Sequence, residues 1–258
     1  MLESPFTINI GSAAVRGTLH LPGSAGPYPA VLWLPGFGGT RVESHRLFVD
    51  GARQLARAGV ASLRIDYRGA GESDGETLDM TIASQIQDAR AALAALRSHP
   101  NVDSTRLALL GYSLGAAIAS QIGDEAGLTA MVFWSPVVFP VPIFARMGLY
   151  AAHPELARQG WIDAGGRRVG RDFLAELTAL DPLGALANWH QPLLVLSGSE
   201  DTVATSENAA ALLEEVAEAE GECLPGANHV FGSVKSRTWL LERSTAWLGG
   251  RLAGVPCS

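Results

Sequence analysis

The segment RLALLGYSLGAAIA, residues 106–119, passes from an apolar run into a stretch rich in alanine. The apolar run 107–110 is typical of a strand buried on both faces, and the small residues after Ser113 favour a helix that packs closely against a sheet. Gly111 and Gly115 keep the crossing of strand and helix free of side chains. The segment therefore predicts a strand, a sharp turn that presents Ser113, and a helix.

The same alternation of apolar runs and helical stretches continues along the chain. Two early segments, PFTINI and VRGTLHLP, alternate polar with apolar residues and predict an antiparallel edge hairpin. Apolar strands that alternate with helices indicate an α/β fold with a mostly parallel central sheet of about eight strands and helices on both faces. We expect one domain, residues 1–258. Strands are predicted at 29–35, 60–66, 106–112, 128–134, 192–198 and 221–226, and helices at 44–58, 80–98, from 113 onward, at 206–218 and at 233–250.

The alternation is interrupted between residues 135 and 190, a range that we call the lid segment. It contains Pro, Gly and one short helix predicted at 171–179. So long an excursion in a compact fold is typical of a lid or a binding insertion. Four aromatic residues in or beside it are candidates for an apolar or aromatic substrate pocket, although each one could instead pack the lid onto the sheet. They are Trp134, Phe139, Phe144 and Trp161.

The charge distribution argues against nucleic acid as a partner, because the net charge is −7 and the basic residues are scattered. The two cysteines form neither a disulfide framework nor a metal-ligand pattern, so we expect Cys223 to be a buried thiol and Cys257 a tail residue. No metal or organic cofactor is implied. The oligomeric state is not predicted.

The N-terminus carries an early acidic residue and no apolar core of signal-peptide length, so a cytoplasmic location is expected. The most apolar stretch begins at Leu128 and is broken by three prolines. It therefore fits a strand and a loop better than a membrane span.

The pattern GxSxG occurs twice, as GESDG at 71–75 and as GYSLG at 111–115. Ser73 lies several residues beyond the preceding strand, and its neighbours Glu72 and Asp74 would oppose an alkoxide. Ser113 lies directly between a strand and a helix, where a hydroxyl projects and backbone N–H groups can face an oxyanion. We therefore predict that Ser113 is the nucleophile and that Ser73 is a loop residue.

A serine nucleophile needs a histidine base and an acid that orients it. His229, in the loop PGANHVFG, follows an apolar segment and should stand at the carboxyl edge of the sheet, whereas His190 precedes a strand and should lie at the opposite edge. Asp201 follows the strand 192–198, with Glu200 as its local competitor. A turn or capping aspartate and an ordinary loop histidine are the alternatives.

An oxyanion hole is predicted where the glycine-rich loop LPGFGGT, residues 34–40, follows a strand. The backbone N–H of Phe37 can join that of Leu114 there. The loop lacks the spacing of known phosphate-binding loops, which argues against a nucleotide site.

Five motifs in order, LPGFGG, DYRGAGESDG, GYSLG, SGSEDTVA and GANHVF, resemble the α/β-hydrolase superfamily over essentially the whole chain. Within it, the chain is most similar to the compact feruloyl and cinnamoyl esterases. The resemblance implies Ser113 as nucleophile, Asp201 as acid and His229 as base, with the N–H groups of Phe37 and Leu114 as the oxyanion hole.

The chain departs from many relatives at the start of the loop 34–40, which we call the oxyanion loop. Many relatives have His-Gly there, and this chain has Pro35-Gly36. Proline offers no side-chain hydrogen bond with which to brace the loop.

The expected activity is hydrolysis of a small carboxylic ester through an acyl-enzyme. Three alternatives stay open: a peptidase or amidase of the same fold, a biosynthetic lyase or cyclase, and a non-catalytic binding protein that retains the fold. Peptidase relatives commonly add a propeller or a large cap, for which 258 residues leave no room.

Overall fold

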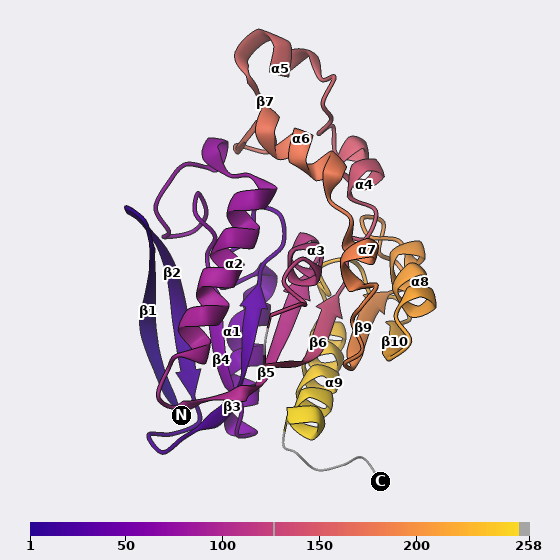
Figure 1. Ribbon diagram of the computed structural model, residues 1–258. Helices are drawn as coiled ribbons and strands as arrows, with labels where there is room; N and C mark the ends of the chain where they lie inside the picture. The colour runs from indigo at the N-terminus through magenta and orange to yellow at the C-terminus, as the bar shows by residue number, and fades with distance from the viewer. Residues whose placement is uncertain (126, 253–258) are drawn as a thin grey trace.

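The computed structural model describes residues 1–125 and 127–252, and over these residues eight strands form one sheet (Figure 1). The strand order is β1-β2-β4-β3-β5-β6-β9-β10. β2 runs antiparallel to β1 and β4, and the remaining neighbours are parallel. The α/β-hydrolase fold class and the antiparallel edge hairpin are therefore confirmed. The strands are β1 (Leu2–Ile10), β2 (Ala13–Leu21), β3 (Tyr28–Leu34), β4 (Ala61–Ile65), β5 (Val102–Tyr112), β6 (Leu128–Trp134), β9 (Leu193–Gly198) and β10 (Ala219–Leu224).

Helices cover both faces of this sheet. α1 and α9 pack together on one face, while α2, α3 and α8 lie on the other. The helices outside the lid segment are α1 (Leu47–Arg57), α2 (Ile82–Arg97), α3 (Leu114–Ser120), α8 (Ser206–Glu215) and α9 (Val234–Leu252), with short 3-10 turns at Ser44–Arg46 and Thr77–Asp79.

Successive side chains of each central strand enter two different cores. In β6, Met131 and Phe133 pack against the face that holds α2 and α3, whereas Val132 and Trp134 pack against the face that holds α1 and α9. This alternation follows from the pleat of a strand. It explains why the central strands are continuous apolar runs, since both of their faces are buried.

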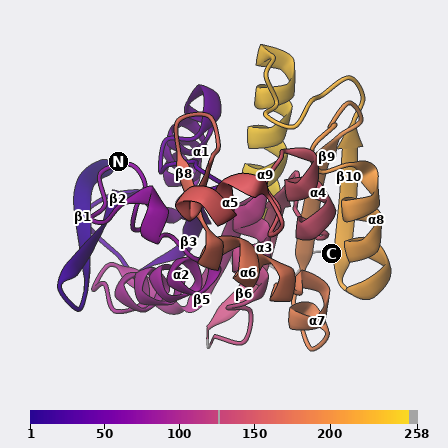
Figure 2. The same ribbon diagram turned by 90° about the horizontal axis from the view of Figure 1, so that it is seen from above.

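The lid segment stands over one end of the sheet, above α3 and β6 in Figure 1. Seen from above in Figure 2, its elements lie across the middle of the sheet. The predicted helix at 171–179 is confirmed, and the other elements of this segment were not predicted. The segment contains α4 (Pro140–Arg146), α5 (Pro154–Gln159), the hairpin of β7 (Trp161–Asp163) and β8 (Arg168–Gly170), α6 (Arg171–Ala179) and α7 (Pro182–Leu186).

One predicted burial is wrong. Cys223 is exposed rather than buried, because β10 is an edge strand in which no residue is fully buried. Cys257 lies outside the described residues. None of the described helices is both long enough and apolar enough to cross a membrane.

Candidate active site

Ser113 occupies a strained turn between β5 and α3. Its backbone angles are φ 55° and ψ −119°, a region that residues with a side chain rarely adopt. The Ser113 N–H donates to the carbonyl of Trp134 at 2.9 Å, which ties the turn to β6. A side chain at Gly115 would collide with the carbonyl oxygen of Leu34, so α3 can approach the sheet only with glycine there. The turn thus presents the Ser113 hydroxyl at the end of the sheet.

Ser113, His229 and Asp201 form a continuous hydrogen-bonded chain. Ser113 Oγ lies 3.0 Å from His229 Nε2, and His229 Nδ1 lies 2.8 Å from Asp201 Oδ2. Because an ionised carboxylate only accepts hydrogen bonds, Nδ1 carries the proton and Nε2 faces the serine hydroxyl as the acceptor. This is the arrangement that a serine nucleophile needs for its activation.

Asp201 is held in place by backbone donors. Its side chain is buried, and Oδ1 accepts hydrogen bonds from the N–H groups of Val203 and Ala204, each at 2.9 Å. The other oxygen, Oδ2, is thereby directed to the imidazole. The turn that the sequence offered as an alternative role for Asp201 is present, and it orients the carboxylate toward His229.

Tyr112 fixes the loop that carries His229. Its hydroxyl donates to the carbonyl of His229 at 3.1 Å, and the two rings lie 5.6 Å apart. Burial raises the pKa of the Tyr112 hydroxyl above its ordinary value, so it remains a donor. Tyr112, directly before Ser113, therefore holds the backbone of the loop at His229.

The oxyanion loop turns tightly after β3. The N–H of Gly39 donates to the carbonyl of Gly36 at 3.0 Å, and the N–H of Gly36 donates to Glu43 Oε1 at 2.8 Å. Among the described residues, the N–H of Phe37 has no hydrogen-bond acceptor. The N–H of Leu114 is in the first turn of α3, where helical N–H groups lack intrahelical partners. Both predicted oxyanion donors are therefore unengaged.

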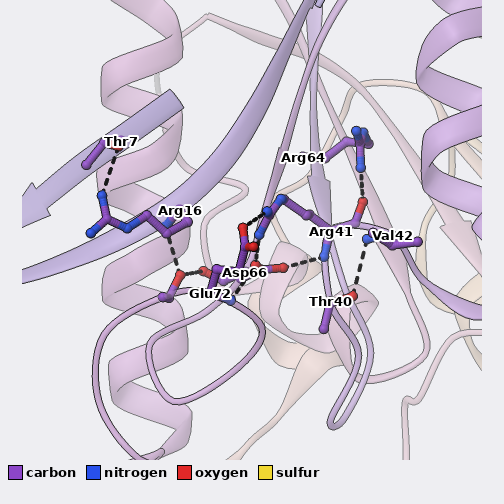
Figure 3. Close-up of polar contacts among 9 residues, drawn as sticks. Thr7, Arg16, Thr40, Arg41, Val42, Arg64, Asp66 and Glu72 are labelled. Carbon is purple, nitrogen blue, oxygen red and sulfur yellow. Dashed lines mark hydrogen bonds and ion pairs between the residues drawn. The ribbon is translucent and has the colours of Figure 1, made fainter. Parts of the chain in front are cut away.

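An ion-pair network anchors the far end of the oxyanion loop (Figure 3). Arg41 pairs through its side chain with both Asp66 and Glu72, and its N–H donates to Asp66 Oδ1 at 2.6 Å. Asp66 is buried, and it also accepts from the N–H of Glu72 at 3.0 Å. Arg64 donates to the carbonyl of Arg41. The motif DYRGAGESDG thus supports the loop that precedes it in the chain.

Ser73, in the other GxSxG pattern, lies beside this network, and its hydroxyl forms its hydrogen bonds outside the oxyanion loop. Its Oγ donates to the carbonyl of Asp66 at 2.7 Å and accepts from the N–H of Arg16 at 2.8 Å. Both hydrogen bonds join backbone segments of neighbouring strands.

A hollow of about 270 Å³ opens in front of Ser113 and His229. Its apolar wall comes from the oxyanion loop, the ends of the strands and α4: Phe37, Val137, Ile143, Phe144, Met147 and Val203. Its polar lining includes Glu43 and Arg167, and Arg167 donates to the carbonyl of Gly38 at 3.0 Å. A larger hollow of about 400 Å³ lies beside β1 and β2, but its lining lacks a nucleophile paired with a base.

Of the four aromatic candidates for the pocket, Phe144 lines the hollow, packed at 5.0 Å from Phe37. The other three are not in its lining among the described residues. The prediction that Trp134 lines the pocket is wrong. Its position in β6 directs the side chain to the face of the sheet that holds α1 and α9, where its indole N–H donates to Ser244 at 2.8 Å. Phe139 is 40% exposed and borders a separate surface hollow. Trp161 pairs with β8 at the outer edge of the lid segment.

Sequence reasoning missed two polar residues of the hollow, Glu43 and Arg167. The only signal for Glu43 was its position a few residues after the oxyanion loop, and for Arg167 its place in the lid segment. Within the described part of the chain, no group of three or more His, Cys, Asp or Glu side chains is arranged to hold a metal ion.

The fold and this site define an α/β hydrolase. The model of the serine aminopeptidase S33 family, Hydrolase_4, matches residues 27–159, about half of the chain, and the chain belongs to this family. An esterase of Enterobacter sp. (strain 638), FrsA, is 34% identical over 140 residues, which are 54% of this chain and 32% of the relative. The chain thus spans about a third of the length of such curated relatives.

Two further similarities cover more of the chain. An uncharacterized protein of Mycobacterium tuberculosis is 30% identical over 211 residues, which are 81% of this chain and 65% of the relative. The structure of Est1E from Butyrivibrio proteoclasticus with ferulic acid bound superposes with a TM-score of 0.85 at 19% identity, covering 96% of this chain and 99% of Est1E. At that identity the likeness concerns the fold.

Proposed function

We propose that this chain is a serine hydrolase that cleaves small carboxylic esters through an acyl-enzyme. The observation that carries the proposal is the uninterrupted hydrogen-bonded chain from Ser113 through His229 to Asp201, at the mouth of a hollow with an apolar wall. The relative named as an esterase supports the choice of ester over other acyl compounds.

The proposed reaction has two halves. Ser113 Oγ attacks the acyl carbonyl while His229 Nε2 takes its proton, and Asp201 stabilises the imidazolium. The N–H groups of Phe37 and Leu114 donate to the oxyanion of the tetrahedral intermediate. His229 then gives the proton to the departing alcohol, and the acyl group stays on Ser113.

In the second half, water takes the place of the alcohol. His229 removes a proton from the water as it attacks the acyl-enzyme, and the same two N–H groups stabilise the second oxyanion. Collapse of this intermediate returns the proton to Ser113 Oγ and releases the carboxylic acid.

The acyl group is proposed to lie against Phe37, Phe144 and their apolar neighbours. A hollow of about 270 Å³ fits one short chain or one ring, since it lies just below the usual range for ligand pockets. The lid segment supplies Phe144 to this wall and is proposed to select the acyl group. Comparing the acetyl, hexanoyl and feruloyl esters of one alcohol, p-nitrophenol, tests this point, because an apolar or aromatic preference fails if acetate has the highest kcat/KM.

The test of the nucleophile is Ser113→Ala, with Ser73→Ala as the matched control. Ser113→Ala should reduce hydrolysis of a short p-nitrophenyl ester to near background and abolish covalent labelling by a fluorophosphonate. Ser73→Ala should keep both. A labelled and active Ser113→Ala variant would sink the assignment.

A peptidase or amidase is the second candidate, favoured by the description of the matching family as a serine aminopeptidase. Amino-acid p-nitroanilides separate it from an esterase, since both use the same residues. We expect kcat/KM for a p-nitrophenyl ester to exceed that for the anilides by several orders of magnitude; the reverse order would replace the ester proposal.

A further inference from the structure

We propose that Glu43 is a positioning residue that sets the oxyanion loop, by taking the backbone N–H of Gly36 and so aligning the neighbouring N–H of Phe37 with the reacting carbonyl. This rests on the proposed function, because the loop matters for chemistry only if Ser113 is the nucleophile. Glu43 itself acts through the loop and is not assigned a step in proton transfer.

The Glu43 carboxylate fills the inside of the loop. Its Oε1 accepts from Gly36 N at 2.8 Å and its Oε2 from Ser44 N at 3.2 Å. A side-chain carbon at Gly39 would collide with Oε1, so the glycine leaves space that the carboxylate occupies. The N–H of Glu43 donates to the carbonyl of Thr40 at 3.1 Å, which closes the loop from the other side.

Other hydrogen bonds hold the loop further on, from the N–H of Gly39 to the carbonyl of Gly36 and from Arg167 to the carbonyl of Gly38, but Glu43 is the acceptor for the N–H of Gly36. Pro35, directly before Gly36, has neither a side-chain donor nor a backbone N–H. The hydrogen bond to Glu43 is therefore the one that holds the peptide N–H immediately before the oxyanion donor. Removing the carboxylate leaves the N–H of Gly36 without its acceptor, so we expect the start of the loop to shift.

Backbone strain accompanies this placement. Glu43 has φ 56°, and His45 and Arg46 follow with φ 54° and 62°. Three non-glycine residues with positive φ within four positions are unusual, and such strain persists only where the surrounding structure enforces it. Here it directs the Glu43 side chain back under the oxyanion loop.

The charges around Glu43 suit a brace that lies beside a developing oxyanion. No arginine or lysine side chain of the described residues hydrogen-bonds to it; the titratable groups near it are His229, Tyr112 and Tyr67, and Arg167 lines the same hollow. Burial raises the pKa of Glu43 to about 7, opposed by the two N–H donors and by His229. The carboxyl is thus only partly ionised near neutral pH, which limits its repulsion of the oxyanion.

The experiment compares Glu43→Ala with Glu43→Gln in the full chain. The amide oxygen that Glu43→Gln introduces can still accept from Gly36, whereas alanine cannot. Two readouts are measured: kcat and KM for a p-nitrophenyl ester, and the rate constant for phosphonylation of Ser113 by a fluorophosphonate. Glu222→Ala, which removes a carboxylate from β10 at the far edge of the sheet, is the control for loss of an acidic side chain.

We expect Glu43→Ala to lower kcat and the phosphonylation rate about 10- to 100-fold, with KM changed less than about threefold, because a displaced donor weakens the transition state more than the bound substrate. Glu43→Gln should recover most of that loss, and Glu222→Ala should match the native chain. Thermal melting identifies any variant that fails to fold, and Glu43→Gln then carries the comparison.

Native kcat and phosphonylation rates in Glu43→Ala would overturn the positioning role. Equal losses in the Ala and Gln variants would do so too, since a role in holding Gly36 predicts rescue by an uncharged acceptor. A native chain that neither hydrolyses esters nor reacts with the fluorophosphonate would instead overturn the proposed function, and this assignment with it.

Discussion

Exchange of Glu43 for glutamine should alter the dependence of stability on pH, with a sign that the structure determines. Burial raises the pKa of Glu43 from its ordinary value of 4.5 to about 7 in the folded chain. The folded state therefore holds this proton more tightly than the unfolded state. The resulting stabilisation is fully present below pH 4.5 and is lost as the pH rises through 7.

The magnitude follows from the difference between the two pKa values. One pH unit corresponds to about 1.4 kcal/mol, so the full difference corresponds to roughly 3 kcal/mol of the free energy of unfolding. Glutamine at position 43 does not titrate. The free energy of unfolding of Glu43→Gln, relative to that of the native chain, should therefore rise by roughly 3 kcal/mol as the pH is raised from below 4.5 to above 7.

Urea unfolding of both proteins at several pH values measures this difference directly. Taking the difference between the two proteins cancels the titration of all groups that they share. Glu222→Gln, on the edge strand β10, controls for the general effect of removing a carboxylate. A difference that stays constant with pH, or a Gln variant that loses relative stability as the pH rises, would refute the reasoning.

Three other substitutions test separate parts of the site. Asp201→Asn should lower kcat for a p-nitrophenyl ester by about 10³- to 10⁴-fold with little change in melting temperature, because an amide does not stabilise the required tautomer of His229. Trp134→Phe should cost about 1–3 kcal/mol in urea unfolding, since it leaves Ser244 without its indole donor, while the order of preference among acyl esters stays unchanged. Ser73→Ala should cost about 1–2 kcal/mol through two lost hydrogen bonds and leave kcat within about twofold.

The arrangement of the main sheet was predictable because its strands are buried on both faces. Segments such as 29–35 and 192–198 are continuous apolar runs, because helices cover both faces of the strands that they form. Such runs between helical segments indicate strands of a parallel sheet. The edge strand β10 shows the limit of this rule. Its residues Glu220 and Glu222 reach solvent, and Cys223 was assigned to the core as if the strand were central.

The pocket was less predictable than the three polar residues in front of it. Ser113, Asp201 and His229 each follow a strand, and the ends of parallel strands meet at one edge, so chain order alone suggested their proximity. The position of Trp134 could have been predicted, because alternate residues of β6 face opposite sides of the sheet. For Phe144 and Phe139 no such rule existed, because the face that α4 presents to the sheet depends on tertiary packing.

Glu43 illustrates a different reason why sequence reasoning stops short. A carboxylate seven residues after Gly36 reaches back to it only because the backbone adopts positive φ at Glu43 itself, and the preference of non-glycine residues argues against that geometry. The positive φ of Glu43 allows its hydrogen bond with Gly36, and local backbone preference predicts that this positive φ is absent. A contact of this kind is therefore found in the folded structure and not from the local sequence.

The two GxSxG patterns differ in what the serine hydroxyl is already bound to. The hydroxyl proton of Ser73 is donated to the carbonyl of Asp66, and its lone pair accepts the N–H of Arg16, so no base can take the proton without breaking the loop. Ser113 Oγ has the imidazole of His229 at 3.0 Å, and Ser113 also lines the hollow. A carbonyl acceptor cannot take up a proton near neutral pH, whereas a neutral imidazole can. The partner of the hydroxyl, which a five-residue pattern does not encode, decides which of the two serines is suited to nucleophilic attack.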